Sequence, residues 1–201
     1  MNSTKIQFSR EELALMTEAE WILTKNTIIR KAQEMFGLLH QDMHRMINQS
    51  SIPIEVKETN AKISRGENYQ GLPFVILDYP RLFNKNDTFA IRILFWWAHY
   101  FTVTLHLKGK YKNDFLPAVM RNLPQFIENN FYVGVSDDEW IHALEEKAYM
   151  PLREIEMKDV KTKLNQQGFL KLTAKIGLIE INQVDEKILN LVQKILMALE
   201  T

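Results

Sequence analysis

A run of alternating side chains at residues 89–107 constrains the fold of this chain more than any other feature. The apolar odd positions are Phe89, Ile91, Ile93, Phe95, Trp97, Phe101, Val103, Leu105 and Leu107. Polar side chains occupy most of the even positions, among them Arg92, Thr104 and His106. A period of two is typical of a strand with one face in the core, because successive side chains point to opposite faces. The run therefore predicts sheet rather than a membrane-spanning helix, although it is nearly long and apolar enough for one.

The same run is too long for a single straight strand. At ~3.3 Å per residue it would exceed ~60 Å, whereas a compact chain of this length is only about 40 Å across. A two-residue hairpin turn would reverse the odd/even parity, and residues 98–100 contain no Gly, Asn or Asp. We therefore expect a bulge, a bent strand or an odd-length connection near His99.

Further strands are predicted before this run. Strand-like segments at residues 62–65 and 72–78 bracket Gly66 and Gly71, and the turn-forming residues 84–87 follow them. Together these segments predict a central antiparallel meander of about four to five strands.

Helices are predicted on both sides of the sheet. Three pairs have the capping-box spacing that marks a helix start, namely Ser9 with Glu12, Thr17 with Glu20, and Ser136 with Glu139. One long amphipathic helix ending near Asn48 is predicted by an apolar stripe made of Trp21, Ile28, Ala32, Met35, Leu39, Met43 and Met46. Asn182 is the expected N-cap of a final helix.

The C-terminal part of the chain is predicted to be mostly helical. Apolar positions suit helices at residues 115–129 and 152–164. Residues 169–176 fit either a strand or a helix, and we favour the helix. With no linker or repeat in the sequence, the chain is expected to form one α+β domain over residues 1–201.

Composition excludes several classes of partner. Basic and acidic residues number 25 each, so no overall field attracts nucleic acid or an anionic membrane, and neither is an expected partner. No cysteine is present, which excludes disulfides and thiolate metal sites. The absence of cysteine and of an apolar leader at residues 1–7 favours a cytoplasmic location.

Charged residues gather in two neighbouring segments. The acidic segment contains Asp137, Asp138, Glu139, Glu145 and Glu146, and the basic one contains Lys158, Lys161, Lys163, Lys171 and Lys175. We interpret both as solvated helix faces that compensate each other's charge.

Polar side chains around the first hairpin suggest a binding site. The candidates there are Arg65, Asn68, Tyr69, Asp78 and Arg81. The guanidinium groups of Arg65 and Arg81 match a carboxylate or phosphate if the two ends of this hairpin meet. The alternative is an ordinary hairpin loop whose polar side chains satisfy its own backbone.

A second group of candidates shares one sheet face. Trp96 points away from Trp97, onto the face that carries Arg92, Tyr100 and His106, where a mixed apolar and polar cavity is conceivable. Helices packed on both faces explain the two tryptophans equally well.

These residues favour binding over catalysis. We expect a module that binds a polar or anionic small molecule, or a protein partner, at the central sheet, because no combination of nucleophile and base is visible. The alternative is a small hydrolase or transferase with His106 or His99 as base and arginines that hold an anion.

No cofactor and no metal are expected. His40 and His44 have the spacing by which two imidazoles share a metal, but Gln41 replaces the glutamate of the metalloprotease pattern. Both histidines also lie on the flank of the apolar stripe, where partly exposed polar residues are common. The apolar face of the final helix suggests a homodimer, although core packing explains the same pattern.

Overall fold

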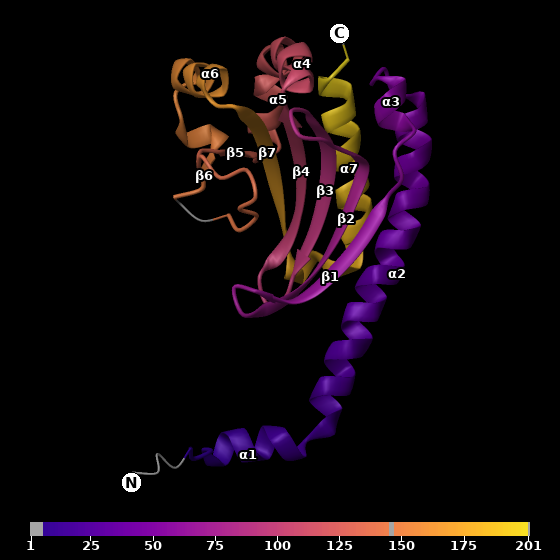
Figure 1. Cartoon of the computed structure of the whole chain (residues 1–201), viewed down its shortest axis with the longest axis vertical. Coiled ribbons are helices and arrows are strands. Elements are labelled where there is room, and N and C mark those ends of the chain that lie inside the picture. Colours follow the sequence, from indigo (N-terminus) through magenta and orange to yellow (C-terminus); the bar gives the residue numbers. More distant parts are fainter. Residues whose placement is uncertain (1–5, 145–146, 201) are drawn as a thin grey trace.

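The computed structural model describes residues 6–144 and 147–200. Residues 1–5, which form most of the segment used to argue for a cytoplasmic location, lie outside the described residues. Glu145 and Glu146 of the acidic segment lie outside them as well. In the described part, the chain forms an antiparallel sheet with helices before and after it (Figure 1).

The sheet has seven strands in the order β1-β2-β3-β4-β7-β5-β6. Their bounds are β1 Lys62–Tyr69, β2 Leu72–Phe83, β3 Thr88–Trp96, β4 Tyr100–Lys108, β5 Tyr132–Gly134, β6 Tyr149–Pro151 and β7 Phe169–Gly177. All pairs are antiparallel, and β1 to β4 form the meander that the sequence predicts. The α+β fold is thereby confirmed, with more strands than the four to five expected.

The long alternating run folds into β3 and β4. The three residues 97–99 connect them, and Trp96 pairs with Tyr100 across the hairpin. This connection has the odd length that keeps the parity of the run. Ala98, the middle residue of this loop, has a positive φ of 60°.

Residues 169–176 form a strand, so the prediction of a helix was wrong. Strand β7 pairs with β4 along its whole length, from Tyr100 opposite Gly177 to Lys108 opposite Phe169. Without it, β4 would leave a full row of backbone groups unpaired at the edge of the meander. The local pattern of this segment suits both a strand and a helix, and the long-range pairing with β4 decides in favour of the strand.

The N-terminal helices are α1 Arg10–Thr17, α2 Ala19–Gln49 and the short α3 Ile54–Lys57. The capping box of Ser9 and Glu12 is confirmed at the start of α1. The second predicted box was wrong, because the Thr17 hydroxyl donates back to Leu13 O while the Glu18 side chain caps α2.

The long amphipathic helix is present, but its buried stripe is shorter than expected. Its buried residues are Ile29, Ala32, Phe36, Leu39, Met43 and Ile47. The stripe therefore begins only at Ile29, whereas Trp21 and Ile28 of the predicted stripe are exposed.

The later helices are α4 Lys110–Arg121, α5 Leu123–Glu128, α6 Met157–Gln166 and α7 Val184–Ala198, with 3-10 turns η1 Leu152–Glu154 and η2 Leu178–Gln183. The predicted start at Ser136 was wrong, because the Ser136 hydroxyl only closes a local turn by accepting from the Asp138 amide. The final helix follows η2 directly, so its N-cap is Gln183 instead of Asn182.

The two faces of the sheet are covered by different parts of the chain. On the core face, the apolar positions of the strands pack in one cluster with α2, α4 and α7. On the second face, Trp96 lies in a small cluster with Ile76, Leu94 and Ala143. Trp97 packs against the core cluster, so the two tryptophans point to opposite faces as expected. Within the described residues, no helix has the length and apolar character needed to cross a bilayer.

Candidate functional site

Two features of the molecule qualify as candidate sites. One is a group of buried polar side chains on the second face, which we call the polar layer: Asp78, Arg92, His106, Glu139, His142 and Lys171. The other is an apolar groove at the end of the sheet. The sequence points to part of the first feature and to none of the chemistry of the second.

An ion pair between neighbouring strands forms the centre of the polar layer. Asp78 on β2 faces Arg92 on β3, and the guanidinium donates from Nε to Oδ1 at 2.6 Å and from Nη2 to Oδ2 at 2.9 Å. Both side chains are nearly buried, at 7% and 13% exposure. Arg92 Nη1 also donates to His142 Nε2 at 2.8 Å, so the guanidinium fork is engaged within the protein.

His106 on β4 is held by a carboxylate. Its Nε2 lies 3.0 Å from Glu139 Oε2, and Lys108 Nζ donates to Glu139 Oε1 at 2.5 Å. Because an ionised carboxylate only accepts, Nε2 of His106 carries the proton. Burial, together with the charges of Lys171, Arg92 and Lys108, lowers the pKa of His106 to about 3. The ring is therefore neutral at pH 7 and is a weak base.

The pKa values of Lys171 on β7 and of His142 are lowered by the same buried surroundings. Burial and the charge of Arg92 lower the pKa of Lys171 to about 7 and that of His142 to about 2. The Lys171 ammonium donates to the main-chain carbonyls of Glu139 at 3.0 Å and Ile141 at 2.6 Å. This lysine therefore attaches the chain at residues 139–141 to the sheet.

Residues 135–144, which we call the covering segment, lie across the polar layer. The Tyr69 hydroxyl accepts from the amides of His142 at 2.9 Å and Ala143 at 2.8 Å, and the Tyr100 hydroxyl accepts from Leu144 N at 2.8 Å. The hollow that remains beside Lys171 has no room for a ligand. The polar layer is thus a filled and internally paired part of the structure.

The structure does not bring Arg65 and Arg81 together. Arg65 pairs with Val75 on the core face, and its Nη1 lies 3.4 Å from Gln33 Oε1 of α2. The guanidinium of Arg81 instead lies 5.7 Å from the centre of the Phe83 ring, which contacts His106 on the second face.

Asn68 and the turn beside it behave as an ordinary hairpin loop. The Asn68 carbonyl oxygen accepts from the Gly71 amide at 3.0 Å. Gln70 and Gly71 both have positive φ, at 51° and 83°, as expected of a tight two-residue hairpin turn. Asn68 therefore belongs to an ordinary hairpin loop whose polar side chains satisfy its own backbone.

His99 lies at the opposite end of β4 from His106. Its ring stacks on Trp96 at 3.6 Å between centroids with an interplanar angle of 9°, and its Nδ1 is 2.9 Å from Trp97 O. Trp96 Nε1 donates to Tyr69 O at 3.2 Å. These contacts give His99 and Trp96 roles in fixing the β3–β4 hairpin.

The histidine pair on α2 is engaged with protein groups. His44 Nδ1 lies 2.6 Å from the Tyr79 hydroxyl, and His44 Nε2 lies 2.9 Å from Asn48 Nδ2. In residues 6–144 and 147–200, no three His, Asp or Glu side chains gather in a way that could hold a metal ion.

The apolar stripe of the final helix is used inside the molecule. Val184, Ile188, Val192 and Ile195 of α7 are buried in the core cluster. Dimerisation through this helix stays a prediction, since nothing in the structure tests it.

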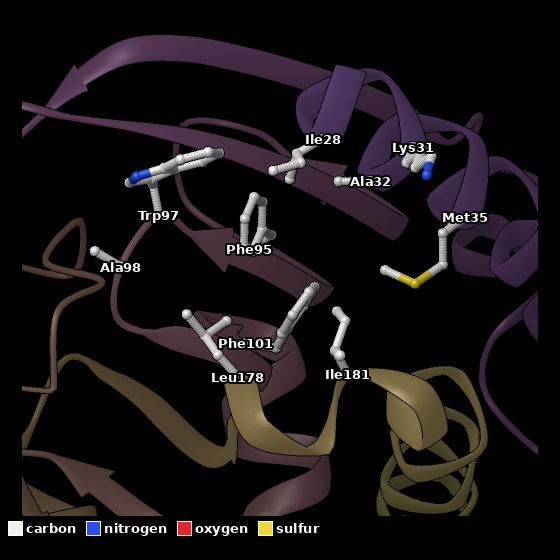
Figure 2. A pocket seen from close by; sticks show the side chains of 10 residues that line it. All are labelled: Ile28, Lys31, Ala32, Met35, Phe95, Trp97, Ala98, Phe101, Leu178 and Ile181. Carbon is white, nitrogen blue, oxygen red and sulfur yellow. The ribbon is translucent and has the colours of Figure 1, made fainter. Parts of the chain in front are cut away.

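The apolar groove lies between α2, the β3–β4 turn and η2, and its volume is about 680 Å³ (Figure 2). It is lined by Ile28, Lys31, Ala32, Met35, Phe95, Trp97, Ala98, Phe101, Leu178 and Ile181. Phe95 on β3 and Phe101 on β4 stack on each other, with 4.9 Å between their ring centroids. Figure 2 shows side chains from all three elements around a common space. Sequence reasoning missed this groove because its lining residues come from three distant parts of the chain.

One charged side chain lines the groove. Lys31 is exposed, and it has no ion pair among the residues that the structure describes. The groove therefore offers an apolar surface with one cation to a ligand.

In comparisons with protein-family models, with curated proteins and with solved structures, no significant match to this chain was found. The geometry of these two features is therefore the basis for the proposed function.

Proposed function

We propose that this chain is a non-catalytic binding module that takes an amphipathic anion, such as a long-chain carboxylate, in the apolar groove. The observation that supports this most directly is the groove itself. Its volume of about 680 Å³ falls within the ~300–1,000 Å³ of ordinary ligand pockets, and such pockets are lined mainly by apolar and aromatic side chains.

Burial of apolar surface supplies the driving force for this binding. Ile28 and Ile181, at opposite sides of the groove, are 39% and 48% exposed in the free protein. Each Å² of apolar surface removed from water contributes about 25 cal/mol. An alkyl chain that covers these side chains therefore gains free energy that a polar ligand would not.

Lys31 gives the groove a preference for a negatively charged head group. Its ammonium is a point charge on a flexible stem, which can follow a carboxylate at the mouth of the groove. An exposed ion pair of this kind contributes only ~0.2–1 kcal/mol, so the apolar body of the ligand supplies most of the affinity.

Non-catalytic binding is also the function expected from the sequence, but the site proposed here is the apolar groove instead of the polar residues of the central sheet. The polar layer does not favour a polar ligand, because Arg92 is paired with Asp78 and the covering segment lies above it. The hydrolase or transferase alternative is not favoured either. His106 is buried with a pKa lowered to about 3, and a general base works best when its pKa is near the working pH.

The test is a titration with a polyene fatty acid whose fluorescence rises in apolar surroundings. Two neighbouring residues of η2 give a matched pair of variants. Ile181 lines the groove, whereas Ile179 is 97% exposed and does not. Ile181→Lys should weaken binding about tenfold or more, equivalent to ~1.4 kcal/mol, while Ile179→Lys should bind like the wild type.

A second variant tests the head group. Lys31→Gln should weaken binding of the carboxylate a few-fold and leave the corresponding uncharged alcohol unaffected. Absence of saturable binding by the wild type, or an equal loss in both isoleucine variants, would overturn the proposal.

A further inference from the structure

The N-terminal part of the chain projects from the molecule. We call residues 6–31 the arm; it contains α1 and the first part of α2 (Figure 1). No residue of α1 is buried, and the first buried residue of α2 is Ile29. Residues 6–23 of the arm therefore receive almost no cover from their own chain, whereas Ile29 near its end joins the core.

The arm is nevertheless an ordered structure. The capping box of Ser9 and Glu12 fixes the start of α1. At the corner between the two helices, Trp21 Nε1 donates to Leu15 O at 3.1 Å. Local hydrogen bonds thus cap the first helix and connect it to the second.

Large apolar side chains are exposed along the arm. They are Ile6, Phe8, Leu13, Leu15, Met16, Trp21, Ile22, Leu23 and Ile28, each at least 39% exposed. Single exposed apolar residues are common on proteins, but a contiguous group of them marks an interaction surface. The nine exposed apolar residues of this one segment therefore indicate an interaction surface.

Charge along the arm identifies the partner of this surface. In residues 6–23, Arg10 is the one basic residue against Glu11, Glu12, Glu18 and Glu20, which gives this part a net charge of −3. Residues 24–31 contain Lys25, Arg30 and Lys31 and no acidic residue, which gives a net charge of +3. The two parts of the arm are electrostatic complements.

We propose that a second copy of this chain covers the arm, with the two arms antiparallel. In this arrangement the acidic part of each arm lies along the basic part of the other, and the apolar side chains are shared between the copies. A parallel arrangement would place charges of the same sign together. The two-fold symmetric contact closes on itself, as in most soluble homodimers.

Existing pairs within the chain do not oppose this contact. Arg30 donates to Glu34 one turn along the exposed surface of α2. Such a surface pair contributes about 0.3–0.5 kcal/mol and is readily exchanged for another carboxylate. Lys25 pairs with Glu67 of β1 and is neutralised there, so Arg30 and Lys31 supply the positive charge that is available to the partner.

The test measures the mass of the full chain in solution by light scattering and sedimentation. The wild type should have twice the 23.7 kDa mass of one chain. The variant Glu11→Lys with Glu20→Lys and the variant Arg30→Glu with Lys31→Glu should each dissociate at least tenfold more readily. An equimolar mixture of the two variants should recover the dimer, because each acidic part again meets a basic part.

A matched pair of apolar substitutions separates the arm from the rest of α2. Met16 in the arm is 66% exposed, and Leu38 beyond the arm is 64% exposed. Met16→Glu should dissociate the dimer at least tenfold more readily, and Leu38→Glu should leave it unchanged.

Three results would overturn the proposal. The first is a wild type that is monomeric at ~100 µM, a concentration above the micromolar dissociation constants of ordinary specific contacts. The others are a mixture of the two charge variants that does not recover the dimer, and a dimer that Met16→Glu leaves intact. The last result would favour the final helix as the interface. Met16 does not line the groove, so Met16→Glu should bind the fatty acid like the wild type whatever its oligomeric state, and failure of either proposal can be told from failure of the other.

Discussion

The two faces of the central sheet come from the same strands, yet they are stabilised differently. On the core face, alternate apolar residues such as Ile93, Val103 and Leu105 pack against helices. On the second face, the intervening positions carry Asp78, Arg92 and Lys171, which bind one another or the covering segment. Apolar burial is non-directional, whereas each buried polar group requires a partner in the right place.

The polar layer has the perturbed pKa values and buried charges often associated with active sites, but its groups are paired within the chain. The groove has few polar groups and leaves apolar surface in water. We therefore expect the polar layer to stabilise the fold, and we expect the binding surface where the chain leaves its apolar groups uncovered.

The largest effect is expected from breaking the ion pair of the second face. Arg92→Leu leaves Asp78 buried without its partner, which should destabilise the protein by about 3–5 kcal/mol. The double variant Asp78→Leu with Arg92→Leu should recover much of this loss, because no charge is then left unpaired. Urea unfolding measures both, and a single variant within 1 kcal/mol of the wild type would contradict our account of this face.

A smaller effect is expected from pH, through the buried histidines of the second face. The pKa values of His106 and His142 are about 3 and about 2 in the folded protein against 6.5 for an ordinary histidine. Below pH 6.5 the unfolded chain therefore binds protons that the folded chain does not, and stability falls as the pH falls. Each histidine contributes up to about 1.4 kcal/mol per pH unit in this range.

Unfolding between pH 6.5 and pH 5 measures this slope. His106→Gln should reduce it by the share of one histidine. Leu105→Ala on the core face should lower stability at every pH, by about 2–5 kcal/mol, and leave the slope unchanged. Equal slopes in the wild type and in His106→Gln would show that this histidine is not held neutral.

The smallest effect is expected at the covering segment. Tyr69→Phe removes the acceptor of two amides, those of His142 and Ala143, and should cost about 1 kcal/mol. Hydrogen exchange should accelerate at these two amides and remain unchanged at the amides of β3. Unchanged exchange at both amides would mean that the tyrosine does not hold this segment.

Much of the fold could be predicted from local pattern. The alternation of apolar and polar residues predicted β3 and β4, because successive side chains on a strand point to opposite faces. The α2 helix followed from its apolar stripe and the start of α1 from its capping box. The strand β7 could not be predicted, since its pattern also suits a helix and only the free edge of β4 decides between them.

The candidate site could be predicted only in part. Asp78, Arg92 and His106 do share one face, as their strand positions imply. Their partners Glu139 and His142 come from a segment that appeared to be a solvated acidic helix, and no local signal places it across the sheet. The groove was invisible for the same reason, because α2, the hairpin turn and η2 meet only in three dimensions.

The sequence by itself determined which side chains of a strand point to the same face of the sheet and where the chain turns. Both properties depend on neighbours only a few residues away. Only the tertiary structure decided which polar groups find partners and which apolar groups do not. Those outcomes depend on contacts between distant segments, and they separate the filled polar layer from the open groove and the uncovered arm.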